Sequence, residues 1–75
     1  MKAILVTKEN FRELGTVYNL DYPEDYLEEG MYLVTEFGVN KPFDMVTSDV
    51  LDAEFVRTGL ILENGFFEIK RKSQI

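Results

Sequence analysis

The most regular alternation of apolar and polar side chains lies in residues 31–37. Because successive side chains of a strand point to opposite sides of a sheet, this alternation predicts a central β-strand. The pattern resumes over residues 43–47 after a turn at 38–42, so the two stretches are predicted to pair as a hairpin. The predicted faces are Met31, Leu33, Thr35 and Phe37 against Tyr32, Val34 and Glu36, then Phe43, Met45 and Thr47 against Asp44 and Val46.

The strongest local signal is an Asn64-Gly65 pair between two apolar stretches near the C-terminus. Asn-Gly favours the two positive φ angles of a type I′ turn, so a second hairpin is predicted over residues 60–70. A two-residue turn would bring Leu60, Leu62, Phe67 and Ile69 together on one apolar face. The opposite face would be half apolar, and its Ile61 and Phe66 are predicted to form an exposed patch through which copies of the chain associate.

The N-terminal part predicts two short strands separated by a short helix. Residues 3–7 are rich in branched side chains and predict a strand, as do residues 16–20. Between them, residues 8–14 predict about two helical turns, with Thr7 as the N-cap and Gly15 at the C-terminal stop position.

One longer helix is predicted at about 49–58, with Ser48 as its cap and Gly59 just beyond its end. The resulting order has neither an internal repeat nor a linker, so we expect a single domain, 1–75, with a frayed tail at 70–75. The expected fold class is α+β, with a small antiparallel, curled or barrel-like sheet of about five to six strands. This one main helix and the C-terminal Asn-Gly hairpin complete the expected fold.

Charge is unevenly distributed along the chain, whose net charge is −6. Residues 21–54 contain ten acidic side chains and a single basic one, Lys41, which gives that section nine net negative charges. The flanking segments are slightly basic, and Lys70, Arg71 and Lys72 form the one basic cluster. Three charges at a chain end provide little for nucleic-acid binding, so direct contact with nucleic acid is not expected.

The amino-acid composition limits the reactions and metal sites that the chain can support. The chain has neither histidine nor cysteine, which removes the commonest nucleophiles, bases and transition-metal ligands. Ser48 fits better as a helix cap than as a nucleophile, and Asp49 and Asp52 fit better as partners of a helix dipole than as metal ligands. We therefore expect no enzyme activity, catalytic residue, metal or cofactor. Without cysteine or a long apolar run, the expected location is the cytoplasm, away from membranes.

The acidic connection before the central strand is the candidate site. It mixes two tyrosines with four carboxylates, and such surfaces grip basic proteins because charge steers the encounter while rings supply contact area. Alternatively, Tyr22, Tyr26 and Leu27 cover the core while the carboxylates face water. The candidate partner-binding residues are Tyr22, Glu24, Asp25, Tyr26, Glu28, Glu29, Glu36 and Asp44.

Residues 29–55 contain a glycine, a Tyr-Leu-Val stretch, a turn, a second predicted strand and a helix with an aromatic residue: Glu29-Gly30-Met31-Tyr32-Leu33-Val34, Gly38, Phe43-Asp44-Met45-Val46 and Glu54-Phe55. Over these residues the chain resembles the short accessory proteins of tailed bacteriophages, many of which have a glycine, a Tyr-Leu-Val strand, a turn, a second strand and a short helix ending in an aromatic residue. The resemblance implies a phage or mobile-element origin, a host cytoplasmic location and inhibition of a host enzyme or defence complex, and it assigns no functional residue.

Three hypotheses follow. The first is a non-enzymatic acidic module that binds the basic surface of another protein, such as a host nucleic-acid-handling or defence protein. The second is a structural or assembly subunit that forms homo-oligomers through the hairpin face of Ile61 and Phe66. The third is a protein that sequesters a small ligand or nucleotide.

Overall fold

The computed structural model describes residues 1–38 and 42–74 and contains five strands, two α-helices and three 3₁₀ turns in those ranges. The predicted turn at 38–42 lies largely outside them. In chain order the elements are β1 (Lys2–Leu5), α1 (Phe11–Val17), η1 (Pro23–Asp25), β2 (Tyr32–Thr35), β3 (Phe43–Val46), α2 (Ser48–Glu54), β4 (Phe55–Ile61), η2 (Glu63–Gly65), β5 (Phe67–Arg71) and η3 (Lys72–Gln74).

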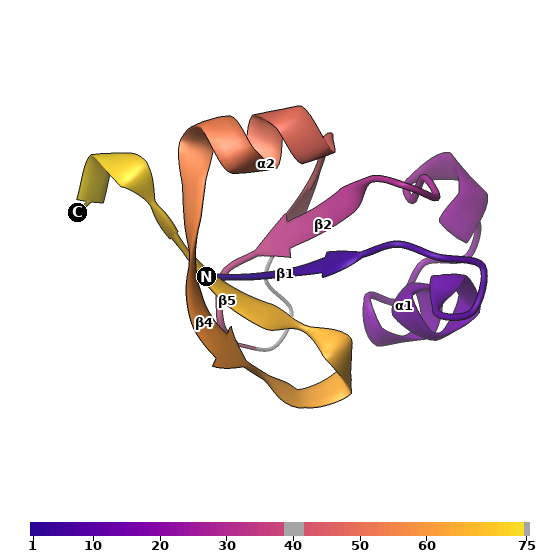
Figure 1. Cartoon of the computed structure of the whole chain (residues 1–75). Helices are drawn as coiled ribbons and strands as arrows, with labels where there is room; N and C mark the ends of the chain where they lie inside the picture. The colour runs from indigo at the N-terminus through magenta and orange to yellow at the C-terminus, as the bar shows by residue number, and fades with distance from the viewer. Residues whose placement is uncertain (39–41, 75) are drawn as a thin grey trace.

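The strands form one antiparallel sheet in the order β3-β2-β1-β5-β4 (Figure 1). This confirms the predicted α+β class. The sheet is open, because the pairing of β3 with β4 that would close it into a barrel is not made, and α2 joins those two edge strands. The interior position of β2, between β3 and β1, explains its burial: Leu33, Val34 and Thr35 are each at most 3% exposed.

Two hydrophobic clusters lie on opposite faces of the sheet. Cross-strand rows place Ile4, Leu33 and Met45 on the face that packs against α1. Ala3 and Val34 lie in the next cross-strand row, on the other face of the sheet, and pack with Leu51 of α2. Successive residues of one strand thus belong to hydrophobic clusters on opposite faces, as the alternation in residues 31–37 predicts.

The first helix differs from the prediction at both ends. Thr7 and Asn10 close a turn instead of starting the helix: the Thr7 N–H donates to Asn10 Oδ1 (2.8 Å) and the Asn10 N–H to Thr7 Oγ1 (3.3 Å). α1 then runs through Gly15 to Val17, so the predicted strand at 16–20 is wrong. The chain turns instead at Asn19, whose φ of 55° lies in the left-handed region.

The second helix is shorter than predicted. Thr47, not Ser48, is its N-cap, with Oγ1 accepting from the Val50 N–H at 3.2 Å. The helix ends before Phe55, which is already extended, and the aromatic and β-branched run that follows forms β4. Gly59 is therefore no helix stop; with φ of 92° it lies between Arg57 and Ile61, where the pairing of β4 with β5 shifts register.

The turn between β4 and β5 contains three residues, Glu63–Gly65, and the two positive φ angles at Asn64 and Gly65 are present. The extra residue moves the register by one position, so Ile61, not Leu62, faces Phe67. Such a shift exchanges the faces of a hairpin. The expectation that Phe66 belongs to an exposed face is wrong, because Phe66 is 5% exposed and lies in the core beside Ile4.

The predicted frayed tail is partly ordered. Lys70 and Arg71 lie in β5, opposite Val56 and Phe55, and the Arg71 guanidinium lies 5.1 Å from the centre of the Phe55 ring. A single 3₁₀ turn, Lys72–Gln74, follows. Two of the three positive charges of this end, those of Lys70 and Arg71, therefore belong to the sheet.

Candidate partner-binding groove

The acidic connection is anchored to the body of the protein at two points. Pro23 packs on Gly15 of α1, so closely that a methyl group added to Gly15 would lie 2.5 Å from Pro23 Cγ. Leu27 is 4% exposed within the core. Between these anchors η1 is closed by hydrogen bonds from the Tyr26 and Leu27 N–H groups to the Pro23 carbonyl, at 3.0 and 2.7 Å.

The anchoring presents both tyrosines to solvent. Tyr22 is 64% exposed and Tyr26 is 59% exposed, whereas Leu27 is buried. Of the three residues that could have covered the core, only Leu27 does so. The tyrosines therefore have free ring faces on a segment whose backbone is held in place.

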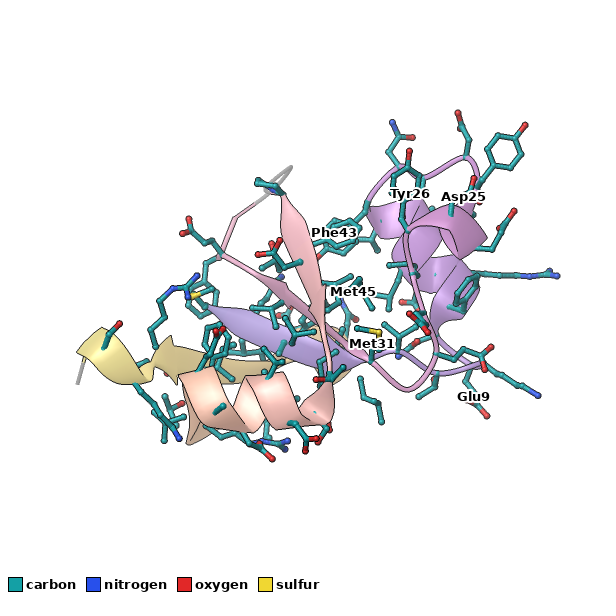
Figure 2. All side chains as sticks on the ribbon, turned by 90° about the horizontal axis from the view of Figure 1, so that it is seen from above. Glu9, Asp25, Tyr26, Met31, Phe43 and Met45 are labelled. Carbon is teal, nitrogen blue, oxygen red and sulfur yellow. The ribbon has the colours of Figure 1, made fainter. Side chains whose placement is uncertain are left out.

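A groove of about 950 Å³ lies between the C-terminal end of α1, the η1 segment and β3. Its wall includes three aromatic rings, of which Tyr18 and Phe43 contact each other with ring centroids 4.9 Å apart and planes tilted by 60°. Tyr26 is the third ring. Figure 2 shows Asp25 and Tyr26 on the η1 side of this groove and Phe43 and Met45 on the β3 side.

Among the residues that the structure describes, Asp25, Asp44 and Lys2 are the charged residues of the groove lining. Asp25 comes from η1 and its side chain is exposed. Asp44 borders the groove from β3, but its side chain lies in the cross-strand row of Val34, on the α2 face. The Lys2 Nζ lies 4.4 Å from the centre of the Phe66 ring. A carboxylate beside exposed aromatic rings forms a setting that attracts a guanidinium or ammonium group.

The eight candidate residues are divided among several places. Asp25 and Tyr26 meet at the groove, which Asp44 borders with its side chain directed to the α2 face. Glu24 and Glu28 line a smaller adjoining cavity of about 180 Å³, together with Asp25 and Tyr26.

The remaining three candidates do not line the groove. Glu36 lines a different cavity of about 170 Å³, which it shares with Arg71. Tyr22 and Glu29 are exposed elsewhere on the connection.

Several groove residues were not predicted as site residues. Phe43 and Met45 had a signal, since their alternation places them on one face. Tyr18 had none, because its segment was assigned to a strand and its position beside Phe43 depends on how α1 packs on the sheet. Lys2 enters the groove through its register with Thr35 and Phe43 on neighbouring strands.

Tyr18 is the described groove residue whose pKa is shifted. Burial raises the pKa of its phenol above the ordinary value, and a hydrogen bond with Thr35 partly opposes that rise. Thr35 is itself buried and its hydroxyl donates to the Pro42 carbonyl at 2.9 Å. The inner wall of the groove is thus fixed by buried contacts.

A second cavity of about 680 Å³ lies on the hairpin side of α1. Its base includes Ile4, Leu14 and Phe66, all buried. The apolar residues of its lining that are exposed are Val17 (60%), Phe37 (48%) and Ile61 (75%).

In the described ranges, Asp and Glu side chains nowhere gather in threes that could hold a metal ion. Every helix in those ranges is too short or too polar to cross a membrane. No protein-family model matches the chain, and neither the curated proteins nor the solved structures include a similar one. The geometry of the groove is accordingly the basis for a functional conclusion.

Proposed function

We propose that this protein is a non-enzymatic binding module that holds a basic segment of another protein in the groove between α1, η1 and β3. The observation that carries the proposal is the position of Asp25 and Tyr26 beside Phe43 in a groove with aromatic walls. The first two come from a short turn and the third from an edge strand further along the chain. Their meeting offers both charge and contact area to one cationic side chain.

The partner that suits this groove has an exposed arginine or lysine on its surface. Proteins that handle nucleic acids carry such basic faces, since they must neutralise phosphates. A small acidic protein that covers such a face would inhibit nucleic-acid binding. Inhibition of a host nucleic-acid-handling or defence protein, as in phage accessory proteins, is the biological setting that we propose.

Binding of a fluorescent arginine-rich peptide, followed by anisotropy at low and high salt, tests the proposal. The charge-reversed double variant Asp25→Lys/Glu28→Lys should bind it at least about tenfold more weakly, because the groove carboxylate and a carboxylate of the adjoining cavity are both lost. Tyr26→Ala should weaken binding by about tenfold through lost ring contact. Raising the salt concentration should reduce the effect of the carboxylates more than that of the ring.

The matched control is Glu9→Lys/Asp52→Lys, which makes the same change in net charge at exposed residues that lie outside the groove lining. Glu9 lies away from Asp25 and Tyr26 in Figure 2. At the high salt concentration this variant should bind within about threefold of the parent protein, since distant exposed charges are then largely screened. Equal weakening by both double variants would mean that net charge alone attracts the peptide, and the groove proposal would be wrong.

Self-association through β4 is the second candidate function. β4 is an edge strand that contains no acidic residue, and its exposed apolar side chains include Leu60 (52%) and Ile61 (75%). Unpaired edges of this kind favour pairing with another chain. Sedimentation should then show dimers that are lost in Leu60→Lys/Ile61→Lys, and a strict monomer at high micromolar concentration would exclude this candidate.

A further inference from the structure

Three aromatic rings from different parts of the chain line the groove. Tyr18 directly follows α1, Tyr26 directly follows η1, and Phe43 is the first residue of β3. Tyr18 and Phe43 contact each other, with ring centroids 4.9 Å apart, and so form one continuous wall. Tyr26 lies on the η1 side of the groove, across from Phe43 (Figure 2). A ligand in the groove therefore meets ring surfaces from two sides.

The described lining offers a bound cation few side-chain hydrogen-bond acceptors. Asp25 supplies the carboxylate, because the Asp44 side chain lies on the α2 face. The other side-chain acceptors are the Asn19 amide and the hydroxyls of the two tyrosines, and the Tyr18 hydroxyl already bonds with Thr35. Most of the described lining side chains are rings or aliphatic groups.

Lysine and arginine differ in how well they suit such a place. The lysine ammonium is a compact, strongly hydrated charge with three donors, and it would leave water for a groove that faces it with one carboxylate. The arginine guanidinium is planar and more weakly hydrated. It can lie flat on a ring while its edge donates to a carboxylate, so it loses less on entering the groove.

We propose that the groove selects arginine over lysine, with the guanidinium against the rings and donating to Asp25, and that Tyr26 determines this preference. The inference rests on the proposed function and narrows the ligand from a basic side chain to arginine. Tyr26 is the exposed one of the three rings and directly follows Asp25 in the chain. Lys2 leaves the place free, because its Nζ lies 4.4 Å from the centre of the Phe66 ring, which lines the second cavity and not the groove.

Anisotropy with two fluorescent peptides tests the preference. The peptides are identical except that every arginine of one is a lysine in the other, so their charges are equal. The parent protein should bind the arginine peptide at least about fivefold more tightly, at low and at high salt, since contact with rings is not screened. Equal affinities would overturn the inference and leave the proposed function standing. If neither peptide is bound more weakly by Asp25→Lys/Glu28→Lys than by the parent protein, both fail.

A third peptide carries trimethyllysine in place of lysine. Its cation is weakly hydrated and suits aromatic rings, but it has no N–H to donate to Asp25. It should therefore bind more weakly than the arginine peptide. Tighter binding of the trimethyllysine peptide would overturn the inference, because the rings would then select a methylated ammonium group.

Variants at position 26 test whether the ring determines the preference. Tyr26→Leu should reduce the arginine-to-lysine affinity ratio to about twofold or less, mainly by weakening the arginine peptide, whereas Tyr26→Phe should keep the ratio of the parent protein. Tyr22→Leu is the matched control, since Tyr22 is exposed on the same connection and lies outside the groove lining. A loss of the ratio in Tyr22→Leu equal to that in Tyr26→Leu would contradict the assignment. Both tyrosines are exposed, so the fold should persist, as circular dichroism verifies.

Discussion

The two helices, equal in length, leave the two faces of the sheet in different states. α1 and α2 each contain seven residues. The α2 face is held together by a cluster in which Leu51 and Ile69 are at most 1% exposed. The α1 face has a comparable cluster and, next to it, two cavities of about 950 and 680 Å³ with exposed apolar edges. The comparison teaches that helix placement decides which face remains available to a partner.

Connectivity explains the placement of each helix. α2 joins β3 to β4, the two edges of the sheet, and leads without a loop into β4, so it is drawn across the face. α1 joins β1 to β2, which are neighbours, and therefore lies beyond one end of this pair (Figure 1). The opposite end of the pair, at Lys2, is bordered by both cavities on the α1 side.

Replacing the buried leucine of each helix by alanine should have the largest effect. Leu51→Ala should cost about 3 to 5 kcal/mol because the sealed face cannot relax around the void. A domain of this size has only about 3 to 5 kcal/mol of net stability, so the variant should be largely unfolded at room temperature. Leu14→Ala should cost about 2 kcal/mol, since Leu14 already borders an open cavity.

Urea denaturation followed by circular dichroism measures both losses. The control is Val50→Ala, which truncates an exposed residue of α2 (38%) and should change stability by about 0.5 kcal/mol or less. Equal losses for Leu51→Ala and Leu14→Ala would show that the two faces are packed alike and would break the comparison.

An intermediate effect is expected from Gly15→Ala, which acts on the α1 side alone. Alanine normally stabilises a helix by about 1 kcal/mol relative to glycine. Here the new methyl group would lie 2.5 Å from Pro23 Cγ, so the η1 segment must move away. We expect a net loss of about 1 to 3 kcal/mol, typical of overpacking.

The displacement of η1 should also weaken binding of the arginine-rich peptide, because Asp25 and Tyr26 belong to the moved segment. Thr16→Ala is the control: it is the next residue of the helix, it is exposed, and its hydroxyl only bonds back to the Arg12 carbonyl. A Gly15→Ala protein that is more stable than the parent, with unchanged peptide affinity, would show that Pro23 does not hold the connection in place.

Local sequence patterns predicted the strands whose side chains alternate between the two faces of the sheet. The strands around Leu33 and Met45 are of this kind, because alternation follows from burial on two sides. The main errors in the predicted helix ends arose at two glycines. Gly15 and Gly59 were both assigned as helix stops, yet Gly15 allows close contact with Pro23 and Gly59 lies where the pairing of β4 shifts register.

The candidate site was predictable in its charge and not in its shape. The acidic run and its tyrosines singled out Asp25 and Tyr26, whereas the predicted Asp44 has its side chain on the α2 face, away from the groove. The groove, however, depends on how α1 packs against β3, and sequence patterns contain no measure of that packing. The register of the C-terminal hairpin failed for a related reason, since one additional turn residue, Glu63, buries Phe66.

The smallest effect is expected from Tyr18→Phe, and it concerns pH. Burial gives the Tyr18 phenol a pKa above the ordinary value of 10.0, so the folded protein holds this proton more tightly than the unfolded chain. The associated stability is fully present below the ordinary value and decreases as the pH rises through the pKa of the folded state. The parent protein should therefore lose stability at alkaline pH relative to Tyr18→Phe, which keeps the ring against Phe43 and has no proton to lose.

Near neutral pH the order should be reversed by a small amount, because Tyr18→Phe removes the hydrogen bond with Thr35, an interaction of about 0.5 to 1.5 kcal/mol. Urea denaturation of both proteins across the alkaline range measures the crossing. Parallel stability curves without a crossing would mean that the Tyr18 side chain is as hydrated as a side chain on the free surface. The α1 face would then be open to water down to the base of the groove.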